Sequence, residues 1–157
     1  MRVSFADLRA QDAPIREELT QAVAEVMLDG NYILGQQVSA FEAAFAIYCG
    51  ARHAVGVSSG LTALELILRG YDIGTGDEVI VPAHTFVGTA AAVSLAGATP
   101  VFVDIDDDYN LSPELAAAAI NKRTRAIIGV HLYGRIARMT ELSALASNHG
   151  LKLIEDA

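Results

Sequence analysis

The chain has 157 residues, 52% of them hydrophobic and 19% charged, a balance typical of a globular domain with a real core and not of a disordered chain. A formal net charge of -8 argues against a surface for nucleic acid or an anionic membrane, and no apolar run is long enough to span a bilayer. The single cysteine, Cys49, excludes an internal disulfide and a cysteine-based zinc site, and no metal site is predicted. The start of the chain has no apolar signal-peptide core, so we expect a reduced, cytoplasmic setting.

The first fifty residues predict helices and no strand. Pro14–Leu28 and Val38–Tyr48 both carry apolar residues at helical spacing. The Asp29-Gly30-Asn31 stretch between them is typical of a helix end. We therefore expect an N-terminal helical arm over residues 1–50.

The sequence pattern changes at residue 53, where short apolar runs begin to alternate with helical patterns. The predicted strands are His53–Ser58, Glu78–Pro82, Thr99–Asp104, Arg125–His131 and Leu151–Glu155. The predicted helices between them are Leu61–Gly70, Thr85–Ala96, one that begins at Ser112-Pro113, and Thr140–His149. Five strands that alternate with four helices indicate βαβ units, and hence an α/β fold of three α/β/α layers around a mostly parallel sheet.

Most of these strands are apolar throughout, which is typical of strands buried on both faces. In such sheets ligands bind beyond the carboxyl ends of the strands. The side chains expected at that edge are Ser58 to Thr62, His84, Thr85, Phe86, Asp104, Asp106, His131, Tyr133, Glu155 and Asp156.

Several of these groups suit an anionic, planar ligand. Small residues and a glycine over Ser58–Thr62 would point backbone N–H groups at a phosphate, although an ordinary strand-to-helix turn has the same composition. Phe86 could stack on a planar ring or belong to the core. Asp156 could pair with a cationic ring nitrogen, or it could be a solvated carboxylate or a helix cap. His84 and His131 could exchange protons or only form structural hydrogen bonds.

Two other motifs point to different chemistry. Gly56-Val57-Ser58-Ser59-Gly60 matches the G-x-S-x-G elbow of serine hydrolases, with Ser58 as the nucleophile. That fold needs a strand and an oxyanion loop upstream of the serine, whereas the upstream residues predict helices. The acidic run Asp104–Asn110 imitates the first half of a calcium loop, but Tyr109 stands where that loop needs glycine. We interpret this run as a solvated turn.

Four stretches of the chain resemble the N-terminal part of the DegT/DnrJ/EryC1/StrS family of sugar aminotransferases. They are NYILGQQVSAFEAAFAIYCGARHAVGVSSG, GTGDEVIVPAHTFVGTAAAVSLAGATPVFVDID, VHLYG and LKLIEDA. The resemblance implies the aspartate-aminotransferase fold, with residues 51–157 as the first part of the domain that binds pyridoxal phosphate. Together with a helical arm that has no core of its own, it also implies a homodimer with its site at the subunit interface. The implied reaction transfers an amino group from an amino acid, with glutamate as the expected donor, to a nucleotide-linked keto-sugar, in polysaccharide or antibiotic sugar biosynthesis.

The resemblance assigns roles to single residues. It implies that Gly60, Leu61 and Thr62 bind the cofactor phosphate, that Phe86 stacks on the pyridine ring and that Asp156 pairs with the ring nitrogen. The substrate-binding residues that we expect on the same basis are Tyr32, Gly35 and His84. Leu61 stands where the family usually has threonine. Leucine at this position resembles the members that act on 3-keto-sugars.

The Schiff-base lysine of the family lies downstream of the LKLIEDA stretch. Lys122 and Lys152 are the two lysines of the chain, and neither matches that position. The chain contains no catalytic residue by this criterion, and we expect it to be inactive alone. A lysine-less binding or regulatory protein with the same fold is the alternative, and a serine hydrolase is a weaker one.

Overall fold

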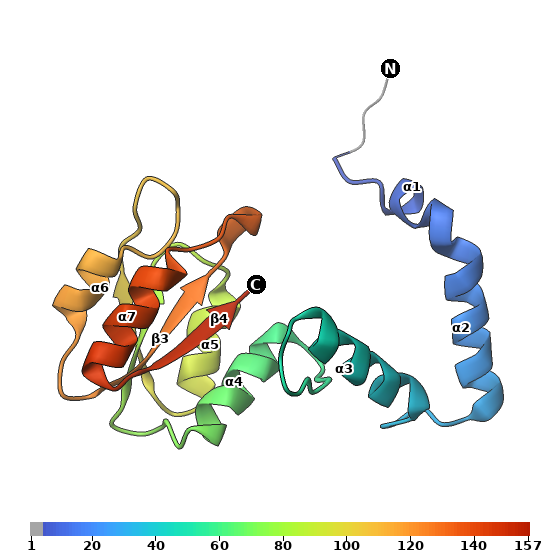
Figure 1. The fold of residues 1–157 in the computed structure, drawn as a ribbon, viewed down its shortest axis with the longest axis horizontal. Helices are drawn as coiled ribbons and strands as arrows, with labels where there is room; N and C mark the ends of the chain where they lie inside the picture. The colour runs from blue at the N-terminus through green and yellow to red at the C-terminus, as the bar shows by residue number, and fades with distance from the viewer. Residues whose placement is uncertain (1–4) are drawn as a thin grey trace. The chain divides into compact units, whose positions relative to one another are not determined.

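The computed structural model describes residues 5–157, which form two compact units, a first that ends at Gly56 and a second that spans Val57–Ala157 (Figure 1). The described part of the first unit contains helices and turns but no strand. Its elements are α1 (Leu8–Asp12), the 3-10 helix η1 (Ala13–Ile15), α2 (Arg16–Asp29) and α3 (Gln36–Tyr48). The two helices predicted for this region are therefore confirmed, and α2 ends where the glycine was expected to end it, at Gly30 with φ +71°.

The helices of the first unit bury very little apolar surface within that unit. Leu19 and Val23 on α2 are 47% and 60% exposed, and Phe41 and Phe45 on α3 are 59% and 46% exposed. The two phenylalanine rings stack with their centroids 5.4 Å apart, yet both remain open to solvent. Helices gain most of their stability by packing an apolar face, so these faces are suited to a partner surface.

The second unit is built on a four-stranded parallel sheet in the order β2-β1-β3-β4. Its strands are β1 (Glu78–Pro82), β2 (Thr99–Val103), β3 (Thr124–Val130) and β4 (Lys152–Asp156). The helices are α4 (Gly60–Gly70), α5 (Val87–Leu95), α6 (Pro113–Ala119) and α7 (Met139–His149), and a short 3-10 helix, η2 (Leu132–Gly134), follows β3. All of them match predicted elements to within two residues at their shared ends, apart from η2, which had no predicted counterpart.

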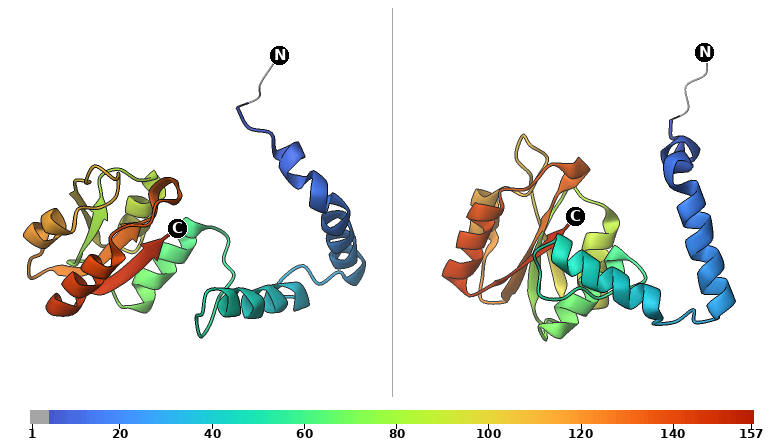
Figure 2. Two further views of the ribbon diagram at one scale, coloured as in Figure 1. Left: turned by 45° about the horizontal axis from the view of Figure 1, so that its top comes forward. Right: turned by 45° about the vertical axis from the view of Figure 1, so that its right-hand side comes forward.

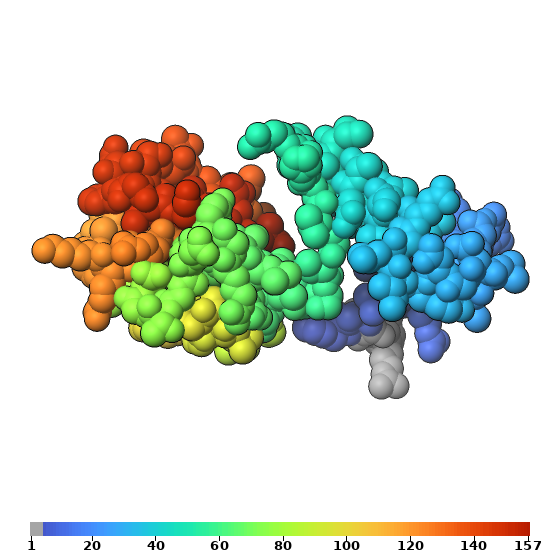
Figure 3. Space-filling view, turned by 90° about the horizontal axis from the view of Figure 1, so that it is seen from below, coloured from blue at the N-terminus to red at the C-terminus, as the bar shows by residue number. Residues whose placement is uncertain are grey.

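Two hydrophobic clusters lie on the two faces of this sheet. Along β1, Val79 and Val81 pack with α4 and α5, whereas Ile80 points to the other face and packs with α6 and α7. Figure 2 shows the two pairs of helices on opposite faces, and in Figure 3 the green to yellow atoms of residues 60–100 form one continuous surface. The predicted α/β/α sandwich with a parallel sheet is confirmed.

The predicted strand at His53–Ser58 is wrong. These residues have no strand assignment, and Val55 remains 77% exposed. The N–H of Gly56 donates a 2.7 Å hydrogen bond to the carboxylate of Glu42 and not to a neighbouring strand. Apolar composition gives a segment a preference for extended backbone, but a strand also needs the edge of another strand to pair with.

Within residues 5–157, no helix combines the length and the apolar character needed to cross a membrane, and no group of three or more His, Cys, Asp or Glu side chains gathers as a metal site would require.

Candidate functional site

A cavity of about 330 Å³ lies at the carboxyl edge of the sheet. The ends of β3 and β4 contribute Val130 and Asp156, and the first turns of α4 and α5 contribute Gly60 and Gly88. The complete lining is Ser59, Gly60, Leu61, Leu64, Thr85, Phe86, Gly88, Thr89, Val130, His131, Leu132, Tyr133, Asp156 and Ala157. The cavity therefore lies where parallel α/β sheets bind their ligands.

Asp156 is held at this edge by a chain of two threonine hydroxyls. Thr89 Oγ1 donates a 2.7 Å hydrogen bond to Asp156 Oδ2, and Thr85 Oγ1 lies 3.0 Å from Thr89 Oγ1. Thr89 is only 1% exposed, so its hydroxyl has little access to water as a competing partner. Because Thr89 donates to the carboxylate, it accepts from Thr85, and the chain fixes the orientation of Asp156. The second carboxylate oxygen, Oδ1, receives no hydrogen bond from the described residues and can accept one from a ligand.

Glu155 points to the other side of the strand, as consecutive strand residues do. Its carboxylate lies 3.3 Å from His131 Nε2, while His131 Nδ1 accepts a 3.2 Å hydrogen bond from the N–H of Ala137. Nδ1 is thus an acceptor, so Nε2 carries the ring proton and donates to Glu155. This arrangement makes the ring of His131 a structural link between β4 and the segment before α7.

Phe86 presents its ring to the cavity. The side chain is 75% exposed, although it directly precedes α5. A Cβ atom added to Gly88 would lie 2.8 Å from Cδ1 and Cε1 of Phe86, closer than real Cβ contacts. The absence of a side chain at Gly88 therefore allows the ring to lie close to the start of α5.

The start of α4 closes another side of the cavity. Ser59 is the N-cap, and its hydroxyl accepts a 3.1 Å hydrogen bond from the N–H of Thr62. The N–H groups of Gly60 and Leu61, in the first turn, have no partner within the helix, as at every helix start. The side chain of Leu61 packs against the core cluster on this face.

The structure gives no support to the hydrolase interpretation of Ser58. Its hydroxyl lies 3.1 Å from that of Thr62, and among the described residues no histidine hydrogen-bonds to it. The strand that should precede a nucleophile elbow is the one missing at His53–Ser58.

Four of the predicted cofactor residues, Gly60, Leu61, Phe86 and Asp156, line the same cavity. Thr62 does not line it, and its hydroxyl is engaged with Ser58 and Ser59.

None of the three predicted substrate residues is among those that line the cavity. Tyr32 and Gly35 belong to the first unit, where the hydroxyl of Tyr32 donates a 3.4 Å hydrogen bond to the carbonyl of Met27. His84 does not line the cavity and instead contacts the rings of Tyr109 and Tyr133.

Both lysines lie at the opposite edge of the sheet. Lys152 is the first residue of β4, and its Nζ lies 4.8 Å from the ring centroid of Tyr71. Lys122 lies two residues before the start of β3, in the connection from α6. Strands in a parallel sheet all start at the same edge, so neither amine reaches the cavity at their carboxyl ends.

A charged cluster on the α6–α7 face surrounds Arg138. Its guanidinium donates to Asp106 at 2.9 Å, to Glu114 at 2.8 and 3.0 Å, and to Glu141. The hydrogen bonds with Glu141 and Glu114 raise the pKa of Arg138, and the hydrogen bond from Arg138 lowers the pKa of Glu114. Arg138 thus joins the loop after β2 to the starts of α6 and α7.

The expectation of a solvated turn over Asp104–Asn110 is wrong at its last residue. Asn110 is 2% exposed; its Nδ2 donates to the carbonyl of Arg135 at 3.1 Å, and its Oδ1 accepts from the N–H of Leu132 at 3.2 Å.

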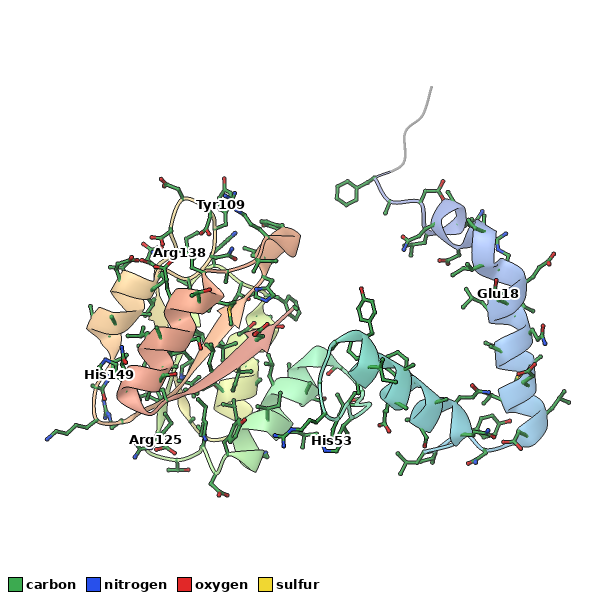
Figure 4. All side chains as sticks on the ribbon, viewed as in Figure 1. Glu18, His53, Tyr109, Arg125, Arg138 and His149 are labelled. Atoms are coloured by element: carbon green, nitrogen blue, oxygen red, sulfur yellow. The ribbon has the colours of Figure 1, made fainter. Side chains whose placement is uncertain are left out.

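Figure 4 shows Tyr109 and Arg138 at the end of the second unit toward which the strands point, and Arg125 and His149 at the other end.

Sequence reasoning missed Thr89 and Asn110. Thr89 had a weak signal, because it is a hydroxyl residue four positions after Thr85 in a helix of mostly small apolar residues. Asn110 had none, since its partners lie 22 and 25 residues downstream.

Comparison with known proteins identifies the family of this chain. Residues 13–157 match the model of the DegT/DnrJ/EryC1/StrS aminotransferase family. The dTDP-3-amino-3,4,6-trideoxy-alpha-D-glucose transaminase of Streptomyces venezuelae is 52% identical over 157 residues, which are 99% of this chain and 41% of that protein. The UDP-N-acetyl-3-dehydro-alpha-D-glucosamine 3-aminotransferase of Acidithiobacillus ferrooxidans is 50% identical over 155 residues, 98% of this chain and 42% of that protein.

Solved structures agree. The crystal structure of Streptomyces venezuelae DesV in complex with a ketimine intermediate matches with a TM-score of 0.97 and 52% identity, over 99% of this chain and 42% of that one. The structure of NtdA from Bacillus subtilis with bound cofactor PMP matches with a TM-score of 0.87 and 34% identity, over 90% of this chain and 33% of that one. The chain thus spans less than half the length of these proteins. With a family match that extends over residues 13–157, the chain belongs to the DegT/DnrJ/EryC1/StrS aminotransferase family.

Proposed function

We propose that the protein containing this chain is a pyridoxal-phosphate-dependent aminotransferase that transfers an amino group from an amino acid, with glutamate as the proposed donor, to a nucleotide-linked keto-sugar. The family and the names of the two relatives support this class of reaction, which serves antibiotic and polysaccharide sugar biosynthesis. The names of both relatives place the amine, or the ketone that it replaces, at carbon 3 of the sugar, in line with Leu61 at the threonine position. A ketone at carbon 3 is therefore the proposed acceptor.

The observation that carries the proposal is the carboxylate of Asp156 at the cavity, fixed by Thr89 and with Oδ1 open to a ligand. An anion in this position suits a protonated ring nitrogen, because a charge-assisted hydrogen bond offsets the desolvation of both groups. Phe86 and the start of α4 line the same cavity, so an aromatic face and the positive end of a helix dipole accompany the carboxylate. This donor and acceptor set fits a planar cationic ring that carries a phosphate.

Each residue has a defined task in this proposal. When bound, pyridoxal phosphate supplies a ring that accepts the electrons of a carbanion. Asp156 keeps the proton on the ring nitrogen, and Phe86 fixes the plane of the ring. The N–H groups of Gly60 and Leu61 bind the phosphate together with the dipole of α4. Thr62 takes part through its hydroxyl only if that group exchanges its contacts with Ser58 and Ser59.

The residues proposed to bind the substrate are Tyr32, Gly35 and His84, in the roles that the resemblance implies.

The first unit supports a homodimer with the site at the subunit interface. Its described helices leave a wide apolar face exposed, including Leu19 and Val23 on α2. We propose that residues 1–50 form an arm that packs on a second copy, and that the enzyme is cytoplasmic. Sedimentation of the full-length protein as a monomer at micromolar concentration would count against the dimer.

The Schiff-base lysine is proposed to come from the part of the full-length protein that this chain does not include, and this chain alone is proposed to be inactive. That lysine would act as the base that moves a proton between substrate carbon and cofactor. The test is to incubate the full-length protein with pyridoxal phosphate, L-glutamate and dTDP- or UDP-linked 3-keto-sugars, and to detect the sugar amine by mass spectrometry. Nucleotide-sugar binding without amine formation would favour the alternative of a lysine-less binding or regulatory protein.

A further inference from the structure

Three aromatic rings from three different loops meet at the rim of the cavity. The ring of His84, in the β1–α5 connection, lies 6.1 Å from the ring of Tyr109 and 6.1 Å from that of Tyr133, measured between centroids. Tyr109 belongs to the loop after β2 and Tyr133 to η2. All three side chains are exposed, with Tyr133 at 82%, and Tyr133 also lines the cavity. The function proposed above for Asp156 and Phe86 uses neither tyrosine.

Both tyrosines have a backbone conformation that tyrosine rarely adopts. Tyr109 has φ +67° and Tyr133 has φ +55°, in the left-handed region that favours glycine and asparagine. Besides Asp72, they are the non-glycine residues with positive φ in the described second unit. Such conformations persist where the surroundings enforce them, and they cluster at ligand-binding sites. Here each strained residue directs a ring toward His84.

The two tyrosine loops are tied together by a buried side chain. Asn110, next to Tyr109, hydrogen-bonds to backbone groups of Leu132 and Arg135, which flank Tyr133 on both sides. The hydrogen bond from Arg138 to Asp106 links the same two segments a second time. Because Asn110 is 2% exposed, water has little access to its amide and cannot readily replace these two hydrogen bonds. The bonds therefore hold the two loops together. Asn110 is therefore a positioning residue for the ring cluster.

We propose that His84, Tyr109 and Tyr133 form an aromatic platform that binds the C–H face of the sugar ring of a nucleotide-linked substrate. The proposal rests on the proposed function and extends it to residues that determine specificity. Tyr133 lines the same cavity as Asp156 and Phe86. The part of the substrate next to Tyr133 is then the part closest to the reacting centre, which is the sugar and not the nucleotide. Aromatic rings bind apolar faces of this size by dispersion and by contact with polarised C–H groups.

The test compares the binding of a nucleotide with that of the matching nucleotide sugar. Calorimetry of the cofactor-loaded full-length protein gives the Kd of dTDP and dTDP-glucose, and of UDP and UDP-glucose, and the ratio within each pair isolates the sugar. Tyr133→Asn removes the ring but keeps a residue that tolerates positive φ, and Tyr133→Phe keeps the ring as a matched control. Asn110→Asp keeps the volume of Asn110 but loses the donor to Arg135.

We expect at least one wild-type pair to favour the sugar, and Tyr133→Asn to reduce that preference roughly three- to tenfold with the Kd of the free nucleotide unchanged. Tyr133→Phe should retain the preference, and Asn110→Asp should reduce it. An unchanged preference in Tyr133→Asn, an equal loss for free nucleotide and nucleotide sugar, or no sugar preference in the wild type overturns the platform. Absence of amine transfer with the expected binding pattern overturns the proposed reaction and leaves the platform supported.

Discussion

Thr89 Oγ1 donates a 2.7 Å hydrogen bond to Asp156 Oδ2, although the two residues lie 67 positions apart in the sequence. The bond joins the first turns of α5 to the end of β4. It orients one carboxylate of an acidic pair toward the cavity, while Glu155 faces His131 on the other side of the strand.

Asp156→Asn in the full-length protein should lower the rate of amine transfer by roughly 100-fold or more, because an amide cannot keep the ring nitrogen protonated. Cofactor affinity should fall by about 1.5–3 kcal/mol as the charge-assisted contact is lost. The matched control is Glu155→Gln, which should change neither quantity appreciably. Single-turnover kinetics and a cofactor titration measure both. If Glu155→Gln is the variant that fails, the assignment of the carboxylate is wrong.

Thr89→Val should weaken cofactor binding roughly tenfold, because the hydroxyl that orients Asp156 is replaced by a methyl group of similar size. It also leaves Thr85 without its hydroxyl partner, so the free energy of unfolding should fall by about 1–2 kcal/mol. Thr89→Ser keeps the donor and should bind the cofactor almost as tightly as the wild type. Equal affinity of Thr89→Val and wild type would show that Asp156 does not depend on this bond.

Gly88→Ala should separate fold stability from cofactor binding. Alanine is favoured over glycine in a helix by about 0.5–1 kcal/mol, so the melting temperature should not fall far. The new Cβ would lie 2.8 Å from the ring of Phe86, which must move, and we expect the cofactor Kd to rise. Gly70→Ala in α4 is the control, since nothing lies within 4 Å of its added Cβ and it does not line the cavity. Unchanged cofactor affinity in Gly88→Ala would refute the stacking position of Phe86.

The stability of the protein should depend on acid through Glu114. Its pKa is lowered in the folded state, chiefly by the hydrogen bond from Arg138, relative to the ordinary value of 4.5. The contact therefore contributes stability above pH 4.5 and loses it as the pH falls through the folded-state pKa. Glu114→Gln should lower the melting temperature at pH 7 and reduce its loss on acidification. In an Arg138→Gln background the same change should have no such effect, and a persisting effect would assign the acid dependence to another group.

Local sequence patterns determined most of the fold. The apolar periodicity of Pro14–Leu28, the run at Glu78–Pro82 and the glycine at Gly30 predicted elements that the structure contains. The edge of the sheet at which ligands bind also followed from the order of strands and helices, and Phe86 and Asp156 are among the residues that this order places there. These inferences succeed because helix and strand periods are properties of a few neighbouring residues.

The tertiary structure alone decided the contacts that depend on which strands pair. The run at His53–Ser58 has the composition of a strand, but strand formation requires a partner edge, which no local pattern encodes. The hydroxyl of Thr89 reaches Asp156 only because β4 lies beside β3, and Asn110 is buried only because the loops after β2 and β3 meet. Hydrogen bonds between residues 22 to 67 positions apart are set by the order of the strands and by packing, so no local sequence pattern predicts them.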